Sequence, residues 1–199
     1  MKWYESAVFY HIYPIGYFGC PRVNDEASEP THKILSVIGD IPHIKELGCD
    51  AIYFGPVFES LWHGYDTSVF ESVAHGYDTI DYRTIDRRLG TNEDFKKVCA
   101  ALHENGIKVI LDGVFNHVGR DFWAFRDVRE HKFSSAKKDW FHIREGNSGY
   151  NDGFFYEGWE GHYELVKLNL YNPEVKQYLK DTITFWKEEF GIDGLRLDV

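Results

Sequence analysis

The chain has 199 residues, of which 43% are hydrophobic and 27% charged, a composition typical of a globular domain with its own core. The formal net charge of −10, with no basic stripe along the sequence, argues against nucleic acid as a partner because acidic surfaces repel phosphates. No apolar run approaches the roughly 18 residues that a membrane span needs, and no signal-peptide stretch follows the first residues. With three cysteines and no CxxC pair, the sequence indicates a cytoplasmic protein that binds neither nucleic acid nor a membrane.

Strands and helices are expected to alternate from the start of the chain. Residues 7–13 are rich in β-branched and aromatic side chains and stop at Pro14, which predicts a buried strand. A short helix should follow, with Asp40 as its N-cap and Gly48 at its C-terminal end. Residues 51–54, again apolar and aromatic, predict a second strand.

The same alternation continues to the last residue. In chain order we expect a helix that Thr91 opens and Asn105-Gly106 ends, a strand over residues 107–111, a helix that Asn172-Pro173-Glu174 opens and Gly191 closes, and a strand over residues 192–199. In the last strand Leu195 and Leu197 should face one way, whereas Arg196 and Asp198 should face the other.

This βαβαβαβ order predicts an α/β fold with a parallel sheet, right-handed crossovers and functional residues at the carboxyl ends of strands. A barrel and an open sheet both satisfy the pattern. Four strands are half of the eight that a (β/α)8 barrel needs, and such barrels typically take about 250 residues. The chain therefore corresponds to part of a barrel if it is one.

One segment is duplicated in tandem. Residues 57–68 and 69–80 are identical at nine of twelve aligned positions, and both contain His-Gly-Tyr-Asp. Since solenoids need about three or more repeats, a duplicated loop segment over 57–80 is the simpler interpretation. Each of its two tyrosines, Tyr65 and Tyr77, could stack on a sugar ring or could be a surface aromatic residue on a tight turn. The sequence does not decide which of the two tyrosines would stack on a sugar.

Two further groups of residues could carry chemistry. Arg196 beside Asp198 would keep that carboxylate ionised and oriented, as a nucleophile requires, although a structural ion pair is an equal alternative. At the end of the third strand, Asp112 could brace the arginine, His117 could bind a sugar hydroxyl and Asn116 could offer an oxygen to calcium. An ordinary strand-end turn would look the same.

Taken together, these motifs resemble the N-terminal half of the α-amylase family of glycoside hydrolases. The resemblance is carried by Phe9-Tyr10-His11-Ile12-Tyr13-Pro14, by Gly48 to Val57, by His-Gly-Tyr-Asp, by Asp112 to His117, and by Asp193-Gly194-Leu195-Arg196-Leu197-Asp198. Residues 165–169, Leu-Val-Lys-Leu-Asn, are similar to a Met-Pro-Lys-Leu-Asn signature of the neopullulanase and cyclomaltodextrinase branch, with two departures.

The resemblance implies a fold and a set of roles. The chain would form the first four strands of a TIM (β/α)8 barrel over residues 1–199, with an insertion resembling a small B domain over residues 118–170. Asp198 would be the nucleophile, Arg196 its partner and Asp112 the brace for that arginine. His117 and the His-Gly-Tyr tyrosine (Tyr65 or Tyr77) would contact the glucose at the cleavage point, and Asn116 falls at a calcium position of the family.

The implied activity is retaining hydrolysis of α-glucans or maltooligosaccharides, with no cofactor needed and structural calcium as an option. Because the family's general acid follows a fifth strand, we expect the 199-residue chain to be inactive alone and to self-associate through its incomplete barrel. A non-catalytic carbohydrate-binding or scaffold fragment is the alternative. An unrelated doubly wound fold is disfavoured because no Gly-rich phosphate loop follows the first strand.

Overall fold

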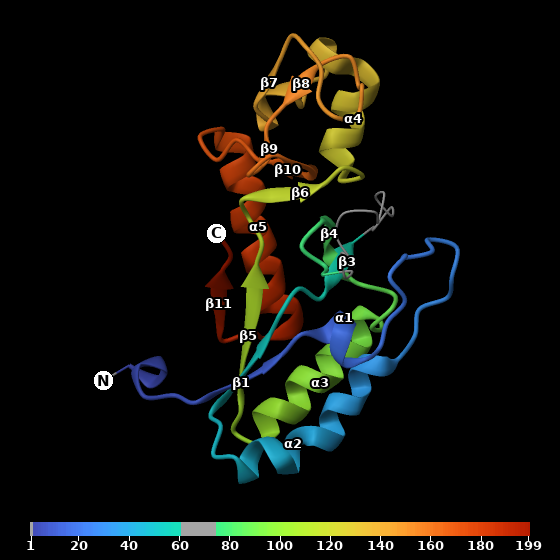
Figure 1. The fold of residues 1–199 in the computed structure, drawn as a ribbon. Helices are drawn as coiled ribbons and strands as arrows, with labels where there is room; N and C mark the ends of the chain where they lie inside the picture. Colours follow the sequence, from blue (N-terminus) through green and yellow to red (C-terminus); the bar gives the residue numbers. More distant parts are fainter. Residues whose placement is uncertain (1, 61–74) are drawn as a thin grey trace.

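The computed structural model describes residues 2–60 and 75–199, and a four-stranded parallel sheet lies at its centre (Figure 1). Its strands are β1 (Phe9–Ile12), β2 (Ala51–Phe54), β5 (Lys108–Gly113) and β11 (Gly194–Leu197), and their order in the sheet is their order in the chain. Each neighbouring pair is parallel. The expected alternation of strands and helices with a parallel sheet is therefore confirmed.

Three long helices connect these strands: α2 (Val37–Glu46), α3 (Asn92–Glu104) and α5 (Pro173–Phe190). The caps expected for two of them are present. Thr91 and Asp94 form a capping box at the start of α3, and the side chain of Asn172 accepts hydrogen bonds from the first backbone amides of α5. Gly191 ends α5 with a φ of 70°, in the left-handed region that glycine adopts without strain.

The start of α2 differs from the prediction. Asp40 lies inside the first turn of the helix, and Ser36 is the N-cap. The reason is that a 3-10 turn, η2 (Lys33–Ser36), leads directly into α2. Ile34 of this turn and Val37, the first residue of α2, are both fully buried. Burial of these two side chains moves the helix start upstream of the sequence signal.

Aromatic residues dominate the core on the helical side of the sheet. Phe54 of β2 packs edge-on against Phe95 of α3 at 5.4 Å between ring centroids, and Phe95 in turn packs against Phe190 of α5 at 5.2 Å. Such edge-to-face pairs add to the free energy of burying each ring. The helices that carry them are thereby fixed against the back of the strands.

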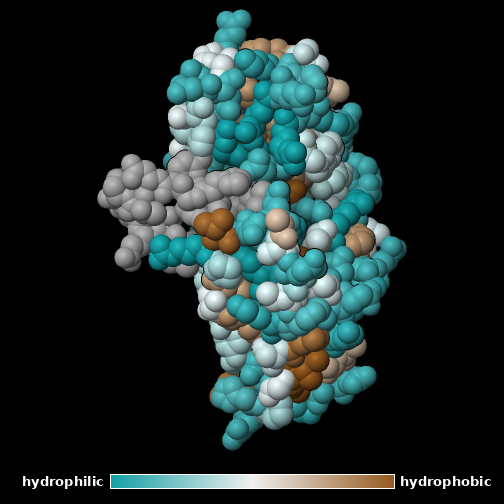
Figure 2. All heavy atoms as spheres, turned by 90° about the vertical axis from the view of Figure 1, so that its right-hand side faces the viewer, coloured by the Kyte–Doolittle hydropathy of each residue, from teal (hydrophilic) through white to brown (hydrophobic). Residues whose placement is uncertain are grey.

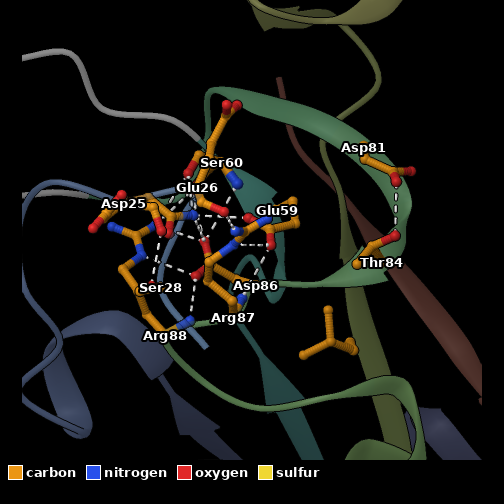
Figure 3. Close-up of polar contacts among 12 residues, drawn as sticks. Asp25, Glu26, Ser28, Glu59, Ser60, Asp81, Thr84, Asp86, Arg87 and Arg88 are labelled. Atoms are coloured by element: carbon orange, nitrogen blue, oxygen red, sulfur yellow. Dashed lines mark hydrogen bonds and ion pairs between the residues drawn. The ribbon is translucent and has the colours of Figure 1, made fainter. Parts of the chain in front are cut away.

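The segment after β2 is not a plain loop. β3 (Phe58–Ser60) and β4 (Thr79–Ile85) form an antiparallel pair, and the residues between them include 61–74, among them Tyr65, which lie outside the described part of the chain. A buried polar network secures the base of this pair (Figure 3). In it Arg88 binds Asp86 through two nitrogens, at 2.9 and 2.6 Å, and Arg87 binds Glu59 of β3 at 2.8 Å.

A separate lobe stands beyond the carboxyl ends of β5 and β11 (Figure 1). Its elements are β6 (His117–Gly119), α4 (Trp123–His131), η3 (Lys132–Ser134), η4 (Lys138–Trp140), β7 (Ile143–Arg144), β8 (Phe155–Tyr156), β9 (Gly158–Trp159) and β10 (His162–Lys167). Strands β6, β10 and β9 form a three-stranded antiparallel sheet. This lobe covers the expected insertion at residues 118–170, whose status as a domain stays a prediction.

Two short elements, η1 (Trp3–Glu5) and α1 (Pro14–Tyr17), complete the chain. The last strand is shorter than predicted, because β11 ends at Leu197 and Val199 has a φ of 43°. Leu197 and Val199 are 67% and 73% exposed, whereas Leu195 is partly buried against the core, so the expected apolar face is buried only at its start. The cause is the position of β11 at the edge of the sheet, with a neighbouring strand on one side only.

The face of the molecule seen in Figure 2 is mostly hydrophilic, with isolated apolar spots. Scattered apolar residues of this kind are usual on protein surfaces. In the described ranges, every helix is too short or too polar to cross a lipid bilayer.

Candidate active site

Asp112 near the end of β5 is the centre of the polar cluster. Its side chain is fully buried, and its Oδ2 accepts hydrogen bonds from the hydroxyls of Tyr53 at 2.6 Å and Tyr77 at 3.1 Å. A buried carboxylate needs partners of this kind, because an unpaired one costs several kcal/mol. Burial, followed by the neighbouring Asp112, raises the pKa of Tyr77 to about 12, so its hydroxyl stays a donor.

Arg196 joins two carboxylates. Parallel pairing places it directly opposite Asp112, and its Nη1 lies 3.0 Å from Asp112 Oδ1 and 2.6 Å from Asp198 Oδ1. The hydrogen bonds to Asp112 are the main cause that raises the pKa of Arg196 above its usual range. The guanidinium is thus permanently charged, and it fixes one oxygen of Asp198.

His117, at the start of β6, faces the same space and is only 2% exposed. The side-chain amide of Asn116 donates to its Nδ1 at 3.2 Å, which leaves the proton of the neutral ring on Nε2. Burial and the nearby His75 lower the pKa of His117 to about 4, and the backbone of Tyr77 offsets part of that effect. Nε2 makes no hydrogen bond of ordinary length with another described residue, so it is an available donor.

A cavity of about 360 Å³ lies beside this cluster and is open to Tyr77, His117 and Asp198. Its described lining consists of His75, Tyr77, His117, Trp159, Leu165, Asp198 and Val199. The size lies within the range of small-molecule sites, and the lining combines apolar and aromatic walls with a few polar groups, which is the usual character of such sites. A flat, partly apolar ligand with hydroxyls at its rim fits this chemistry.

The structure places Tyr77, from the second copy of the duplication, in this cavity. The backbone amide of Tyr77 donates to Nδ1 of His75 at 3.0 Å. The next residue, Asp78, is buried, which raises the pKa of its carboxyl. A Cβ on Gly119 of β6 would lie 2.4 Å from the Asp78 carbonyl oxygen, so this close approach requires glycine.

Sequence reasoning did not single out three residues of the site. Tyr53 is the closest hydroxyl to Asp112, and its ring stacks on His11 at 4.4 Å. Trp159 of β9 lines the cavity, and its ring lies 6.1 Å from that of His117. His75 was visible only as part of the repeated His-Gly-Tyr-Asp. For Tyr53, one sequence signal was available: it lies near the end of the second strand, which neighbours the strand of Asp112 in a parallel sheet.

Asn116 is half-buried at the edge of the cluster, and its backbone carbonyl accepts a hydrogen bond from Leu168 at 2.9 Å. Over residues 2–60 and 75–199, no group of three or more His, Cys, Asp or Glu residues is placed to hold a metal ion. Calcium typically takes six to eight oxygen ligands. The calcium role of Asn116 therefore rests on the resemblance alone and stays a prediction.

Polar side chains that converge at the carboxyl ends of parallel strands, with an arginine between two carboxylates beside a cavity, are the arrangement of an α/β enzyme. The family "Alpha amylase, catalytic domain" matches residues 27–199. The chain belongs to this family, whose members are glycoside hydrolases that act on α-glucans. The recognition made from the sequence is confirmed.

Named relatives agree on the branch. The chain is 36% identical to a cyclomaltodextrinase from a Bacillus species, in a match that covers 99% of this chain and 36% of the relative. It is 38% identical to neopullulanase 2 from Thermoactinomyces vulgaris, in a match that covers 100% of this chain and 34% of the relative. A solved structure of the cyclic α-maltosyl-(1→6)-maltose hydrolase from Arthrobacter globiformis, in complex with that sugar, superposes with a TM-score of 0.80 at 36% identity. It covers 100% of this chain and 45% of that one.

The chain spans about a third of the length of these curated relatives, between 34% and 36%. The activity and substrates of a whole protein that contains it are accordingly matters for proposal.

Proposed function

We propose that the chain provides the nucleophile and part of the sugar-binding cavity of a retaining α-glucan hydrolase, with Asp198 as the nucleophile. Arg196 would orient Asp198, and Asp112 would hold Arg196. His117 and Tyr77 would contact the glucosyl unit whose bond is cleaved.

One observation carries the proposal: Nη1 of Arg196 is shared between the fully buried Asp112 and Asp198, and Asp198 lines the cavity with His117. A purely structural ion pair has no need of an adjacent hollow. The side chain of Asp198 is 11% exposed, so it is both shielded and reachable from the cavity. Partial shielding strengthens the electrostatic effect of the arginine.

In the proposed first step, an oxygen of Asp198 attacks the anomeric carbon, the bond from that carbon to the glycosidic oxygen breaks, and the leaving oxygen takes a proton. Water then cleaves the resulting ester and regenerates the carboxylate. His117 would donate from Nε2 to a sugar hydroxyl throughout, since the Asn116 amide donates to its Nδ1 and leaves the ring proton on Nε2.

Protonation of the leaving oxygen needs a second carboxyl group, about 5–5.5 Å from the nucleophile in retaining enzymes. Among the described residues that line the cavity, Asp198 alone carries a side-chain carboxyl, and Asp112 is engaged by Tyr53, Tyr77 and Arg196. We therefore propose that these 199 residues alone do not turn over a glucan with a sugar leaving group.

The test uses a substrate whose leaving group departs without being protonated. A maltosyl fluoride with a second fluorine on the reacting ring loses fluoride readily and leaves a slowly hydrolysed ester. Incubation with the purified chain should add one maltosyl group, which peptide mass spectrometry should place on Asp198. The matched variant Asp198→Asn should remain unlabelled.

Labelling of another residue, or equal labelling of Asp198→Asn, would contradict the assignment. If the chain binds maltooligosaccharides but is never labelled, the alternative of a non-catalytic carbohydrate-binding module is the better reading. Relatives called cyclomaltodextrinase, maltogenic α-amylase and neopullulanase support α-glucosidic oligosaccharides as the substrates to try first.

We also propose that the sheet is the first half of a (β/α)8 barrel, with the lobe as its insertion. The support is the strand order, since four parallel strands in chain order with helices between them match half of a closed barrel. A cytoplasmic location also remains a proposal, supported by relatives named intracellular maltogenic amylase.

A further inference from the structure

A second hollow lies on the surface between β4, the start of α4 and α5. It is a shallow groove of about 540 Å³, and its lining includes Asp81, Arg83, Asp121, Trp123, Arg126 and Tyr178. None of these residues lines the catalytic cavity. The proposed reaction at Asp198 gives none of them a role.

Trp123 is the main apolar surface of this groove. It is 46% exposed although it is one of the largest side chains in the chain. Its ring is nevertheless held firmly, edge-on against Trp140 at 5.2 Å and at 64° to Tyr178 at 6.0 Å. A rigid, amphipathic ring that is partly open to solvent provides contact area at little cost in conformational entropy.

The charged side chains that line the groove are equal in number, and outside the lining Lys137 lies 5.8 Å over the Trp123 ring and is itself paired with Glu174 at 3.0 Å. Two arginines, Arg83 and Arg126, stand against two aspartates, Asp81 and Asp121, so a charged ligand gains no net attraction. Asp121 is paired with Arg129 at 3.0 Å. Arg126 is exposed and makes no ion pair or side-chain hydrogen bond within the described ranges, so its guanidinium is available to two neighbouring hydroxyls.

We propose that this groove is a second carbohydrate site, which binds a neutral sugar chain by stacking on Trp123 and by hydrogen bonds from Arg126. An apolar ring face with a balanced set of planar polar groups fits the apolar face and hydroxyl rim of a sugar. The choice of an α-glucan as its ligand rests on the proposed function. The groove would hold a long glucan while another part of the same chain occupies the catalytic cavity.

Two linked sites increase the affinity for long chains far more than for short ones, by about 10²- to 10⁴-fold when the geometry permits both to engage. Retardation of the purified chain in gels containing soluble amylose measures the affinity for long chains. Calorimetry with maltotriose measures the affinity for short ones. We expect Trp123→Ala and Arg126→Ala each to weaken amylose binding about tenfold and to leave maltotriose binding unchanged.

Two controls separate the sites. Tyr171→Ala removes an aromatic ring that is 88% exposed and outside the groove, and should change neither measurement. His117→Ala should reduce maltotriose binding and leave the groove intact. Arg126→Ala should not disturb the fold, because the Arg126 side chain is exposed and is not part of the core, so a loss of binding in this variant cannot be attributed to misfolding.

Unchanged retardation in both groove variants overturns the groove, whatever the labelling of Asp198 shows. A loss confined to Trp123→Ala, accompanied by a lower melting temperature, is due to lost packing against Trp140 and overturns it too. If Asp198 is never labelled but retardation still depends on both Trp123 and Arg126, the groove stands and the proposed hydrolase fails.

Discussion

The burial of His117 makes a quantitative prediction about stability against pH. Its pKa is lowered from 6.5 to about 4, first by burial and then by the nearby His75. Between those two pH values the unfolded chain binds a proton at this position that the folded chain does not. Stability therefore rises with pH in this window, is fully present above about pH 6.5, and is lost as the pH falls toward 4.

The magnitude follows from the shift in proton affinity. Each tenfold change in proton affinity is worth about 1.4 kcal/mol. Protonation of His117 in the unfolded chain should therefore lower the free energy of unfolding by about 2.5 kcal/mol when the pH falls from 7 to 4.5. The comparison is with His117→Asn, which keeps a neutral hydrogen-bonding side chain that does not titrate. The difference in unfolding free energy between pH 7 and 4.5 should be smaller in the variant by that amount.

Urea unfolding followed by tryptophan fluorescence at the two pH values measures this difference. The control is His131→Asn, which removes a histidine of α4 whose side chain is 51% exposed. If His117→Asn loses as much stability on acidification as the unmutated chain, the ring is not held neutral by the fold. The role of Nδ1 as the acceptor of the Asn116 amide would then lose its physical basis, because a protonated ring donates from both nitrogens.

Four further results are expected. Arg196→Ala should destabilise the fold by about 2 kcal/mol, because Asp112 stays buried without its cation, and should slow the labelling of Asp198, because that carboxylate loses the partner that orients it; Arg196→Lys should restore part of both, and an unchanged labelling rate would exclude the pairing. Gly119→Ala should cost about 2 kcal/mol in urea unfolding through its clash with the Asp78 carbonyl, and an unaffected midpoint would contradict the close approach. Deletion of residues 57–68 should leave yield and melting temperature unchanged, because residues 69–72 repeat Val57 and the Phe-Glu-Ser of β3; loss of folded protein would show that the extra copy is structural. The open edge of β11 should make the purified chain self-associate in size-exclusion chromatography with light scattering, and a sharp monomer would count against this.

The sequence predicted the sheet and helices well wherever local signals and tertiary packing agree. Thr91 and Asn172 are caps whose effect is local, and the structure has them as expected. Asp40 was misplaced because burial of Ile34 and Val37 decided where α2 begins, and burial depends on contacts distant in sequence. The polar base of β3 and β4 was missed for the same reason, since its partners come from separate segments.

For the site, sequence order placed the charged residues but not the walls. Asp112, Arg196 and Asp198 could be brought together in advance, because parallel strands put their carboxyl ends at one edge. Trp159 could not, since its position depends on how the lobe folds back over β6. The choice between Tyr65 and Tyr77 was also beyond sequence; Tyr77 contacts Asp112, and Tyr65 lies outside the described residues.

The cavity draws most of its lining from residues that belong to two different sheets or directly follow them. Asp198 follows the parallel sheet, whereas Trp159 and Leu165 belong to the antiparallel strands of the lobe. Substitutions in the lobe's strands can therefore reshape one wall of the cavity while the ion pairs of the parallel sheet stay untouched. A change at Trp159 or Leu165 should accordingly alter which ligands fit the cavity without altering the pairs of Arg196, so a search for a changed ligand preference should begin at β9 and β10.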